Sequence, residues 1–369
     1  MSPRSKQHPE SKEMFQEVDR FVDGLIKSAK TRLRIEPGFN RVCICGMGGS
    51  AMSGDIISDA LKMDWDVPIK VIRSTNIPNW VDDRTLVIAS SYSGNTRETL
   101  MMYEQAKAKG CRIIVITAGG ELRDKCIMNS DKLLEVPSNM QPRSSIGYMI
   151  GYLANIIQTS GGPKVRNELM KTVSTLRKFR GSIWVRNSDS PAKSIAERMH
   201  ATVPAIYADG ALASVAVRWK NQINENSKMI AFNGVIPEMN HNEIVGWSEC
   251  VQRTKCRPVF LYENGISNAA GSMMNESIEV LRSSGIDPEV IPIDGKTTPE
   301  RSLKAVMLGD YVSLFLASMN GVDPMDIAPI TSFKKRLAAR LSRKKDKPKK
   351  EKKAGKKKKP PVTDDQPLS

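Results

Sequence analysis

The chain has 369 residues, more than a single hydrophobic core usually serves, so we expect two domains. No apolar run approaches the roughly 20 residues of a membrane-spanning helix, and the N-terminal stretch is polar, so the sequence predicts a soluble cytoplasmic protein with no membrane contact and no secretory signal. The net charge of +16 is concentrated near the C-terminus, which leaves a body that is only mildly basic.

The first half of the chain alternates between predicted strands and helices. Apolar residues at helical spacing predict a helix over residues 10–33, which leads into the first strand. Strands are then expected at 41–45, 68–74, 85–90 and 112–118, with an edge strand at 132–138 and helices over 50–63 and 97–110. Short apolar strands that alternate with helices predict a parallel sheet covered on both faces.

The same alternation restarts after a helical region over residues 147–180. Strands are expected at 203–210, 257–263 and 288–295, helices at 211–228, 276–285 and 302–321, and a connector with a last helix over 321–341. The predicted fold class is therefore α/β, with two domains that each contain a parallel sheet flanked by helices. We place the domains at residues 1–160 and 161–339, followed by a tail at 340–369.

The first strand ends in the loop "GMGGSA", residues 46–51, which precedes a helix and fits the G-x-G-x-x-A pattern of dinucleotide-binding loops. An NAD site would need an acidic residue after the next strand, and that position holds Arg73 and Ser74. Arg73 could serve the phosphate of NADP. A nucleoside triphosphate is disfavoured, because no Gly-Lys-Ser/Thr closes the loop.

A second loop, "SSYSGNTRET" at residues 90–99, collects hydroxyl side chains before another helix. Ser91, Ser93 and Thr96, with the local backbone N–H groups and the helix dipole, can surround one compact phosphate. An isolated Ser at such a turn usually caps the helix, but the whole cluster favours phosphate binding. With this second loop, Gly48, Gly49 and Ser50 of the first are expected to lie against the ligand that carries this phosphate.

The cysteines do not predict a metal site. Their spacings contain no paired Cys-x-x-Cys pattern, and Cys43 and Cys45 fall in a strand that should be buried, where they serve as small apolar residues. We expect no metal ligands in this chain.

Several motifs together resemble a known family. "GMGGSAMSGD" and "SYSGNTRET" resemble the sugar isomerase (SIS) domain. "QPRSSIGYM" (141–149), "RWKNQINENSK" (218–228), "PEMNHNEIVGW" (237–247), "GVDP" and "ITSFKKRL" are similar to the bifunctional phosphoglucose/phosphomannose isomerases of archaea and bacteria. The resemblance extends to about residue 338 and leaves the Lys-rich tail unexplained.

The resemblance implies two SIS domains and a reversible isomerisation of glucose 6-phosphate, and of mannose 6-phosphate, to fructose 6-phosphate. The reaction would pass through a cis-enediol without a metal or a redox cofactor. The resemblance also implies a homodimer with shared active sites.

Roles for four residues follow from the same resemblance. Glu225 would carry the proton between C1 and C2, and His241, reaching the site from the neighbouring subunit, would open the sugar ring. Arg143 would stabilise the enediolate, a task suited to a permanent cation. Lys334 would border the sugar ring, although adjacent Lys335 leaves the register of this lysine open.

Two other functions remain compatible with the sequence. A non-catalytic SIS regulator would bind a sugar phosphate, but it predicts a fused DNA-binding helix-turn-helix, and none is apparent. An NADP-dependent oxidoreductase would use the first loop for its cofactor. An amidotransferase-type isomerase is disfavoured, because no N-terminal glutaminase cysteine is present.

Residues 340–369 contain 13 Lys or Arg against four Asp or Glu, a net charge of +9, and almost no apolar side chains. Such a segment cannot offset the entropy of ordering, so we expect a disordered tail. It either aids solubility or makes weak, salt-sensitive contact with nucleic acid or an acidic partner.

Overall fold

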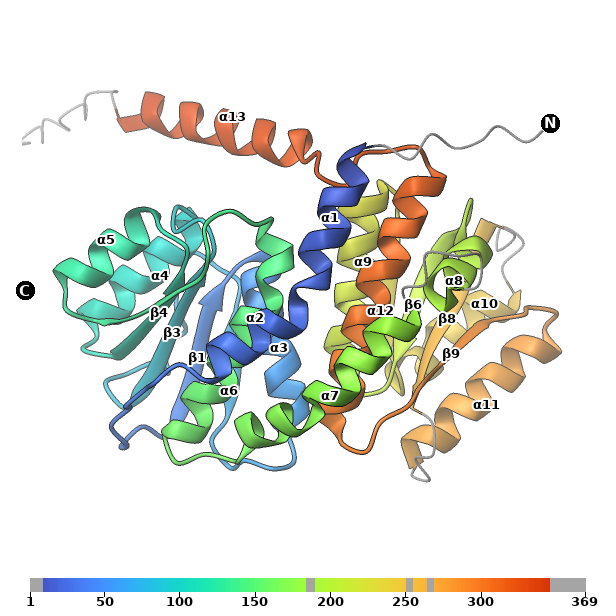
Figure 1. Cartoon of the computed structure of the whole chain (residues 1–369), viewed down its shortest axis with the longest axis horizontal. Helices are drawn as coiled ribbons and strands as arrows, with labels where there is room; N and C mark the ends of the chain where they lie inside the picture. The colour runs from blue at the N-terminus through green and yellow to red at the C-terminus, as the bar shows by residue number, and fades with distance from the viewer. Residues whose placement is uncertain (1–8, 184–189, 250–254, 264–268, 346–369) are drawn as a thin grey trace, which may run out of the picture. The chain divides into compact units, whose positions relative to one another are not determined.

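The computed structural model describes residues 9–183, 190–249, 255–263 and 269–345 (Figure 1). The chain divides into two compact units, one ending at Asp326 and one beginning at Ile327. Both sheets belong to the first unit. The described part of the second unit contains helix α13 (Ala328–Lys345).

The first sheet has five parallel strands in the order β2-β1-β3-β4-β5. These strands are β1 (Arg41–Gly46), β2 (Ile69–Ile72), β3 (Thr85–Ser91), β4 (Arg112–Thr117) and β5 (Lys132–Glu135). Central β3 is buried along its whole length, as expected for a strand with helices on both faces. The predicted edge strand near residue 133 is confirmed as β5.

The second sheet has four parallel strands in the order β7-β6-β8-β9. They are β6 (Val203–Ala208), β7 (Phe232–Val235), β8 (Cys256–Glu263) and β9 (Glu289–Ile293). In both sheets the first strand lies between the second and the third, so the two halves repeat one topology. The predicted α/β class with two parallel sheets is confirmed.

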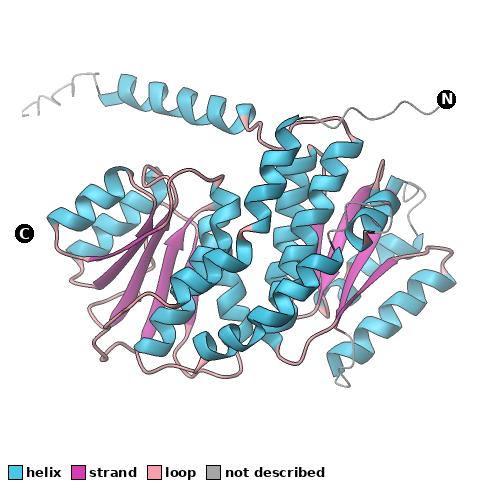
Figure 2. Cartoon of the chain, in the orientation of Figure 1, coloured by secondary structure: helices cyan, strands magenta, loops and turns pink. Residues whose placement is uncertain are grey.

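A layer of helices lies between the two sheets and shares one apolar core with both (Figures 1 and 2). Its members are α1 (Pro9–Asp19), α2 (Phe21–Ala29), α3 (Gly48–Leu61), α6 (Ile146–Thr159), α7 (Val165–Ile183), α8 (Pro191–Met199), α9 (Ala213–Ser227) and α12 (Thr298–Met319). Helices α4 (Arg97–Ala108) and α5 (Gly120–Met128) cover the outer face of the first sheet. Helices α10 (Glu243–Glu249) and α11 (Ala269–Ser283) cover the outer face of the second.

Helix α12 is the one helix among the described residues that is long and apolar enough to cross a membrane. However, 78% of its most apolar window is buried inside the protein, where it packs against α7, α8 and α9. Its length and composition therefore serve the core between the two sheets.

Three predicted segments differ from the structure. The helix expected over residues 10–33 breaks at Arg20, so that α1 packs on α12 while α2 packs along α6. The helical region expected over 147–180 consists of two helices, α6 and α7, and a 3-10 turn, η1 (Pro142–Ser145), precedes them.

The third difference is at the C-terminus, where we expected disorder from Arg340. Helix α13 continues to Lys345, because Leu, Ala, Arg and Lys are strong helix formers. The rest of that segment, 346–369, lies outside the described residues. The predicted boundary after residue 160 stays a prediction, since the first unit holds both sheets and a core shared between them.

Candidate active site

The two phosphate-binding loops predicted from the sequence meet at the carboxyl ends of β1 and β3. Helix α3 follows β1 into the central core through Met52 and Ile56, whereas α4 follows β3 onto the outer face through Met102 and Tyr103. The chain thus leaves these adjacent strands in opposite directions. In open α/β sheets, ligands bind at this reversal of strand order.

Side-chain hydrogen bonds join the two loops. The backbone N–H of Tyr92 donates to Ser50 Oγ over 3.1 Å, and Ser91 Oγ lies 3.0 Å from Thr96 Oγ1. Neither α3 nor α4 has a side chain that caps its N-terminus. The first-turn N–H groups of both helices and these hydroxyls therefore form a cradle suited to a single phosphate.

Ser93 lies in the same turn, and its side chain is exposed. Its Oγ accepts a hydrogen bond from the backbone N–H of Asn95 over 3.2 Å, which shapes the turn that leads to Thr96. The hydroxyl proton of Ser93 is not used in this bond and can be donated to an anion.

Glycines in the first loop allow it to approach the turn η1 closely. Gly48 adopts a left-handed φ of +50°, which side chains rarely tolerate. A Cβ on Gly49 would lie 3.3 Å from Arg143 Cα and 3.4 Å from Pro142 O. The loop and η1 are therefore in direct contact, and the structure places Arg143 beside the phosphate cradle.

Arg143 is buried and held by residues from distant parts of the chain. Its Nε donates to Asn226 Oδ1 over 2.7 Å, its Nη1 to Gln141 Oε1 over 3.1 Å, and its Nη2 to the Pro324 carbonyl over 2.5 Å. Burial lowers the pKa of Arg143, while the negative charge of Glu225 acts to raise it. The guanidinium is thus a fixed cation with little freedom to turn.

Glu225 faces this cation from the last turn of α9. One of its oxygens, Oε2, lies 3.7 Å from Arg143 Nη1, which is an ion-pair distance beyond hydrogen-bond contact. The Glu225 side chain is 34% exposed, whereas that of Arg143 is 4% exposed. A carboxylate that can be reached from solvent therefore stands beside a buried cation.

His241 does not lie beside Glu225 within one chain. Helix α9 begins after the carboxyl end of β6 and runs back toward the amino end of the sheet, so Glu225 lies near that amino end. Strand β7 then returns parallel to β6, and the short turn η2 (Glu238–His241) follows its carboxyl end. The 15 residues of α9 span about 22 Å, so one chain does not bring His241 to Glu225.

Lys334 and Lys335 both lie on exposed positions of α13, in the second unit. The described structure therefore does not decide between the two, and their approach to the site stays a prediction.

Lys228 is a neighbour of the site that sequence reasoning did not single out. Its Nζ donates to the carbonyl oxygens of Glu225, over 2.6 Å, and Asp326, over 2.7 Å. Burial lowers its pKa, and the positive charge of Arg143 lowers it further. Lys228 thus ties the end of α9 to the segment that contains Pro324. Lys228 belongs to the motif "NENSK" and its partner Asp326 follows the motif "GVDP", but only the fold shows that these two segments are in contact.

The described residues offer few ligands for a metal ion and no free arginine at the position considered for NADP. Among the described residues no group of three or more His, Cys, Asp or Glu side chains gathers as a metal cluster would. Arg73, the candidate for an NADP phosphate, forms an ion pair with Asp55 of α3.

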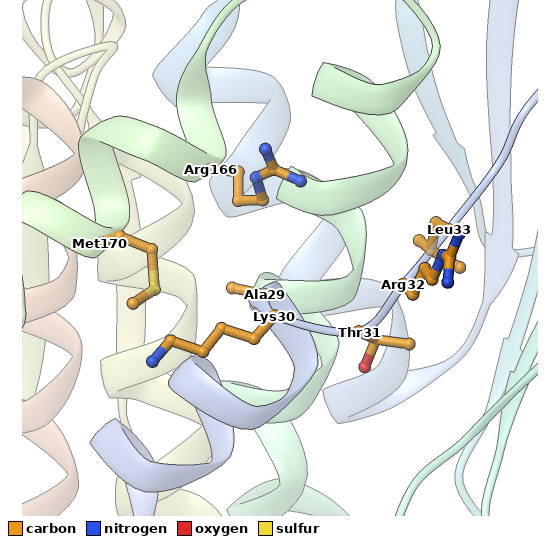
Figure 3. A pocket seen from close by; sticks show the side chains of 7 residues that line it. All are labelled: Ala29, Lys30, Thr31, Arg32, Leu33, Arg166 and Met170. Carbon is orange, nitrogen blue, oxygen red and sulfur yellow. The ribbon is translucent and has the colours of Figure 1, made fainter.

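A separate cavity of about 530 Å³ lies at the end of α2, next to α7, and contains none of the predicted site residues. Its lining consists of Ala29, Lys30, Thr31, Arg32, Leu33, Arg166 and Met170 (Figure 3). The side chains of Lys30 and Arg32 extend in opposite directions, so its cations do not converge on one point. The carboxyl ends of β1 and β3 therefore remain the candidate active site.

Family models match both halves of the chain. A model of the SIS domain matches residues 39–128, and one described as the bacterial phospho-glucose isomerase C-terminal SIS domain matches residues 188–337.

Among solved structures, a hypothetical protein of Thermus thermophilus superposes with a TM-score of 0.69 at 16% identity, covering 92% of each chain. The C-terminal domain of glucosamine-fructose-6-phosphate aminotransferase from Francisella tularensis gives 0.66 at 13% identity, covering 87% of this chain and 98% of that domain. At such identities these likenesses show the fold alone.

Curated relatives show more. A bifunctional phosphoglucose/phosphomannose isomerase of Aquifex aeolicus is 32% identical over 300 residues, which are 81% of this chain and 91% of the relative. One from Caldicellulosiruptor bescii is 35% identical over 306 residues, 81% and 90% of the two chains. A D-glucosamine-6-phosphate 4-epimerase of Sulfolobus acidocaldarius is 33% identical over 240 residues, 64% of this chain and 74% of the relative. With this likeness over four fifths of its length, the chain belongs to the bifunctional phosphoglucose/phosphomannose isomerase family.

Proposed function

We propose that this enzyme interconverts fructose 6-phosphate with glucose 6-phosphate and with mannose 6-phosphate. The observation that carries the proposal is the pair Arg143 and Glu225, a buried cation beside an accessible carboxylate, in direct contact with a loop of the phosphate cradle. Aldose–ketose isomerisation needs this combination: an anchor for the phosphate, a base for the carbon-bound proton and a positive charge for the enediolate.

The phosphate of the substrate binds at the carboxyl ends of β1 and β3. Ser50, Ser91, Ser93 and Thr96 supply hydroxyls, and the uncapped first turns of α3 and α4, including Gly48 and Gly49, supply backbone N–H groups and favourable dipoles. The Ser91 and Thr96 hydroxyls, 3.0 Å apart, can both turn toward a phosphate oxygen, since hydroxyl rotors are free to reorient.

Glu225 removes the proton from C2 of the open-chain aldose, and Arg143 stabilises the negative charge that develops on the enediolate oxygens. The proton returns to C1, while a proton passes from O2 to O1, so the atoms balance without a redox partner. Glucose 6-phosphate and mannose 6-phosphate differ at C2 only, and both lose that stereocentre in the shared enediol. No step of this scheme requires a metal.

His241 opens the sugar ring, and we propose that it comes from a second copy of the chain in a homodimer. Two observations support this. Glu225 and His241 lie near opposite ends of the second sheet within one chain. Large apolar side chains near His241 and at β7 are exposed, namely Phe232 at 60% and Val245 at 62%, with Ile230 at 69%. We propose that a second copy of the chain covers these side chains. Lys334, or Lys335, borders the ring in the completed site.

Complementation between inactive variants tests the shared site. Glu225→Gln and His241→Ala should each be inactive alone. When the two are co-expressed, half of the dimers contain both chains and each of these has one intact site, so about a quarter of wild-type activity should return. The matched control pairs Glu225→Gln with Arg143→Lys, which belong to one chain's half of the site and should not complement. No recovery in the first pair would contradict a shared site.

A coupled assay of the purified protein with fructose 6-phosphate tests the reaction itself. We expect aldose products with and without EDTA, and no cofactor released on denaturation. Loss of activity on chelation would contradict the metal-free scheme, and a requirement for NADP would favour an oxidoreductase. The ion pair between Arg73 and Asp55 argues against NADP, because the arginine is already neutralised. Glucosamine 6-phosphate serves as a control substrate. A regulator without catalysis would bind sugar phosphate and yield no product.

We propose further that the enzyme acts in the cytoplasm and that each sheet with its helices forms one domain, divided near residue 160.

A further inference from the structure

A buried polar ridge runs along α9 toward the candidate active site. Arg218, Gln222 and Asn226 follow one another at intervals of four residues, so they share one face of the helix. All three are buried, and they face α12 and η1. Such side chains are costly to bury unless each finds a partner, so their contacts indicate what the ridge does.

The first part of the ridge holds the backbone of Arg143. Arg218 forms a two-bonded ion pair with Asp310 of α12, with Nε and Nη2 at 3.0 and 2.7 Å from the two carboxylate oxygens. Gln222 Nε2 donates to the same carboxylate over 2.9 Å. Arg218 Nη2 also donates to the carbonyl oxygen of Arg143 over 3.1 Å. The main chain of η1 is thus fixed to a neutralised pair of buried charges.

The last member of the ridge, Asn226, holds the side chain of Arg143. Its Oδ1 accepts the Nε proton of Arg143 over 2.7 Å, and its Nδ2 donates to Ser313 Oγ over 2.9 Å. The Ser313 hydroxyl in turn donates to the carbonyl oxygen of Asp310 over 2.7 Å. Both ends of the amide are therefore engaged, and Asn226 cannot turn without breaking one of these bonds.

We propose that Asn226 is a positioning residue that fixes the plane of the Arg143 guanidinium. Bonds to Asn226, Gln141 and Pro324 hold all three nitrogens, and Nη2 also donates to Met14 Sδ over 3.9 Å. They leave the Nη1 edge pointing toward Glu225, 3.7 Å away, where the substrate oxygens have to lie. The inference rests on the proposed role of Arg143 in stabilising the enediolate.

The neutral amide has a second advantage over a carboxylate at this position. An aspartate would accept the same Nε proton but would also neutralise the guanidinium from behind. The charge of Arg143 would then be shared between residue 226 and the substrate. An asparagine orients the cation and leaves its charge for Glu225 and the enediolate.

The test is steady-state kinetics of Asn226→Ala and Asn226→Asp. For Asn226→Ala we expect kcat to fall roughly 10–100-fold with KM changed by less than about threefold, because a misplaced guanidinium affects the transition state more than substrate binding. Asn226→Asp should also lose kcat, although the carboxylate can still accept the Nε proton of Arg143. The matched control is Asn221→Ala, on the same helix, whose side chain makes no hydrogen bond among the described residues and which should retain wild-type kinetics.

A double-mutant cycle with Arg143→Lys separates positioning from mere packing. If Asn226 acts through the guanidinium, Asn226→Ala should cost less than about threefold in kcat when Arg143 is already lysine. A full additive loss in that background, or an unchanged kcat in Asn226→Ala with a lowered Tm, would overturn the inference. If Arg143→Lys itself keeps the wild-type kcat, the proposed role of Arg143 fails instead. If Asn226→Ala does not fold, Ser313→Ala replaces it in the test. This variant removes the far partner of Asn226, together with the bond to the Asp310 carbonyl, and should lower kcat with KM nearly unchanged.

Discussion

The Ser91 and Thr96 hydroxyls bond to each other and, among the described residues, to no backbone group, which leaves them available to an anion. We expect Ser91→Ala and Thr96→Ala each to raise KM for fructose 6-phosphate roughly tenfold, the cost of one hydrogen bond to a charged group, with kcat nearly unchanged. We expect these hydroxyls to contact the phosphate equally in the ground and transition states. Ser58→Ala, in α3 but away from its N-terminus, should leave KM unaltered. A fall in kcat at constant KM would argue that the cradle does not hold the phosphate.

Substitution of Glu225 should lower kcat and leave KM nearly unchanged, the opposite of what we expect for Ser91 and Thr96. Replacing it with Gln keeps its size but removes the base, so kcat should fall by roughly 10²–10⁴-fold for both aldoses, while KM stays within a small factor. The measurement is the coupled assay in both directions. Glu276→Gln, an exposed carboxylate on α11, is the control. Near-normal turnover of glucose 6-phosphate and mannose 6-phosphate by Glu225→Gln would show that the base has been misassigned.

At the scale of elements, the two sheets repeat one topology but differ at their carboxyl edges. The edge at β1 and β3 ends in hydroxyls and uncapped helices, whereas β6 and β8 end in the buried carboxylates Asp209 and Glu263. Glu263 Oε2 lies 2.5 Å from Arg301 Nε, and its Oε1 is buried without a hydrogen-bond partner among the described residues. A phosphate would be repelled there, so the repeated topology does not imply a second sugar-phosphate site.

Glu263 gives this edge a pH dependence. Burial, reinforced by the nearby Asp209, raises the pKa of Glu263 from 4.5 to about 7, although Arg301 opposes the shift. The folded state therefore holds more protons than the unfolded state between these values, and stability should decline as the pH rises from 4.5 to about 7. In Glu263→Gln the drop in Tm between pH 5 and pH 8 should shrink by roughly 2–4 °C, measured by thermal denaturation. Glu279→Gln, an exposed control, should keep the wild-type dependence of Tm on pH. If Glu263→Gln also keeps it, the pKa of Glu263 is not raised.

Most elements were predictable, because most strands are short apolar runs, but β7 (FNGV) and α5, which buries only Leu122 and Cys126, carry no such pattern. The break at Arg20 was not, since it depends on two partners, α12 and α6, that pull successive turns in different directions. The continuation of α13 to Lys345 was also missed, because composition alone cannot separate a charged helix from a charged tail.

At the scale of the whole molecule, the sequence predicted the two loops but not the long-range contacts that bring distant residues to Arg143. Ser91 and Thr96 are local to one turn. Arg143, by contrast, meets Asn226 across 83 residues and Pro324 across 181 residues, and no local pattern encodes such contacts. The separation of Glu225 from His241 likewise emerges only from the direction of α9 between two parallel strands.

The basic C-terminal segment is the other feature of the whole molecule that awaits a role. Removing residues 346–369 should leave isomerase activity within about twofold of wild type, because no proposed site residue lies there. We expect the truncated protein to bind a random oligonucleotide at least about tenfold more weakly at low salt, since lysines release counterions from the nucleic acid on binding. Unchanged binding would end the nucleic-acid interpretation of the segment and leave solubility as its role.

The reach of Arg143 to Pro324 also has a consequence for how the protein is made. During synthesis the hydroxyl cradle and Arg143 emerge from the ribosome early, but the carbonyl that holds Nη2 of Arg143 emerges 181 residues later. Chains that stop before this point lack a fixed guanidinium. A prematurely terminated chain should therefore not convert a sugar phosphate, and catalysis should begin only when translation is nearly complete.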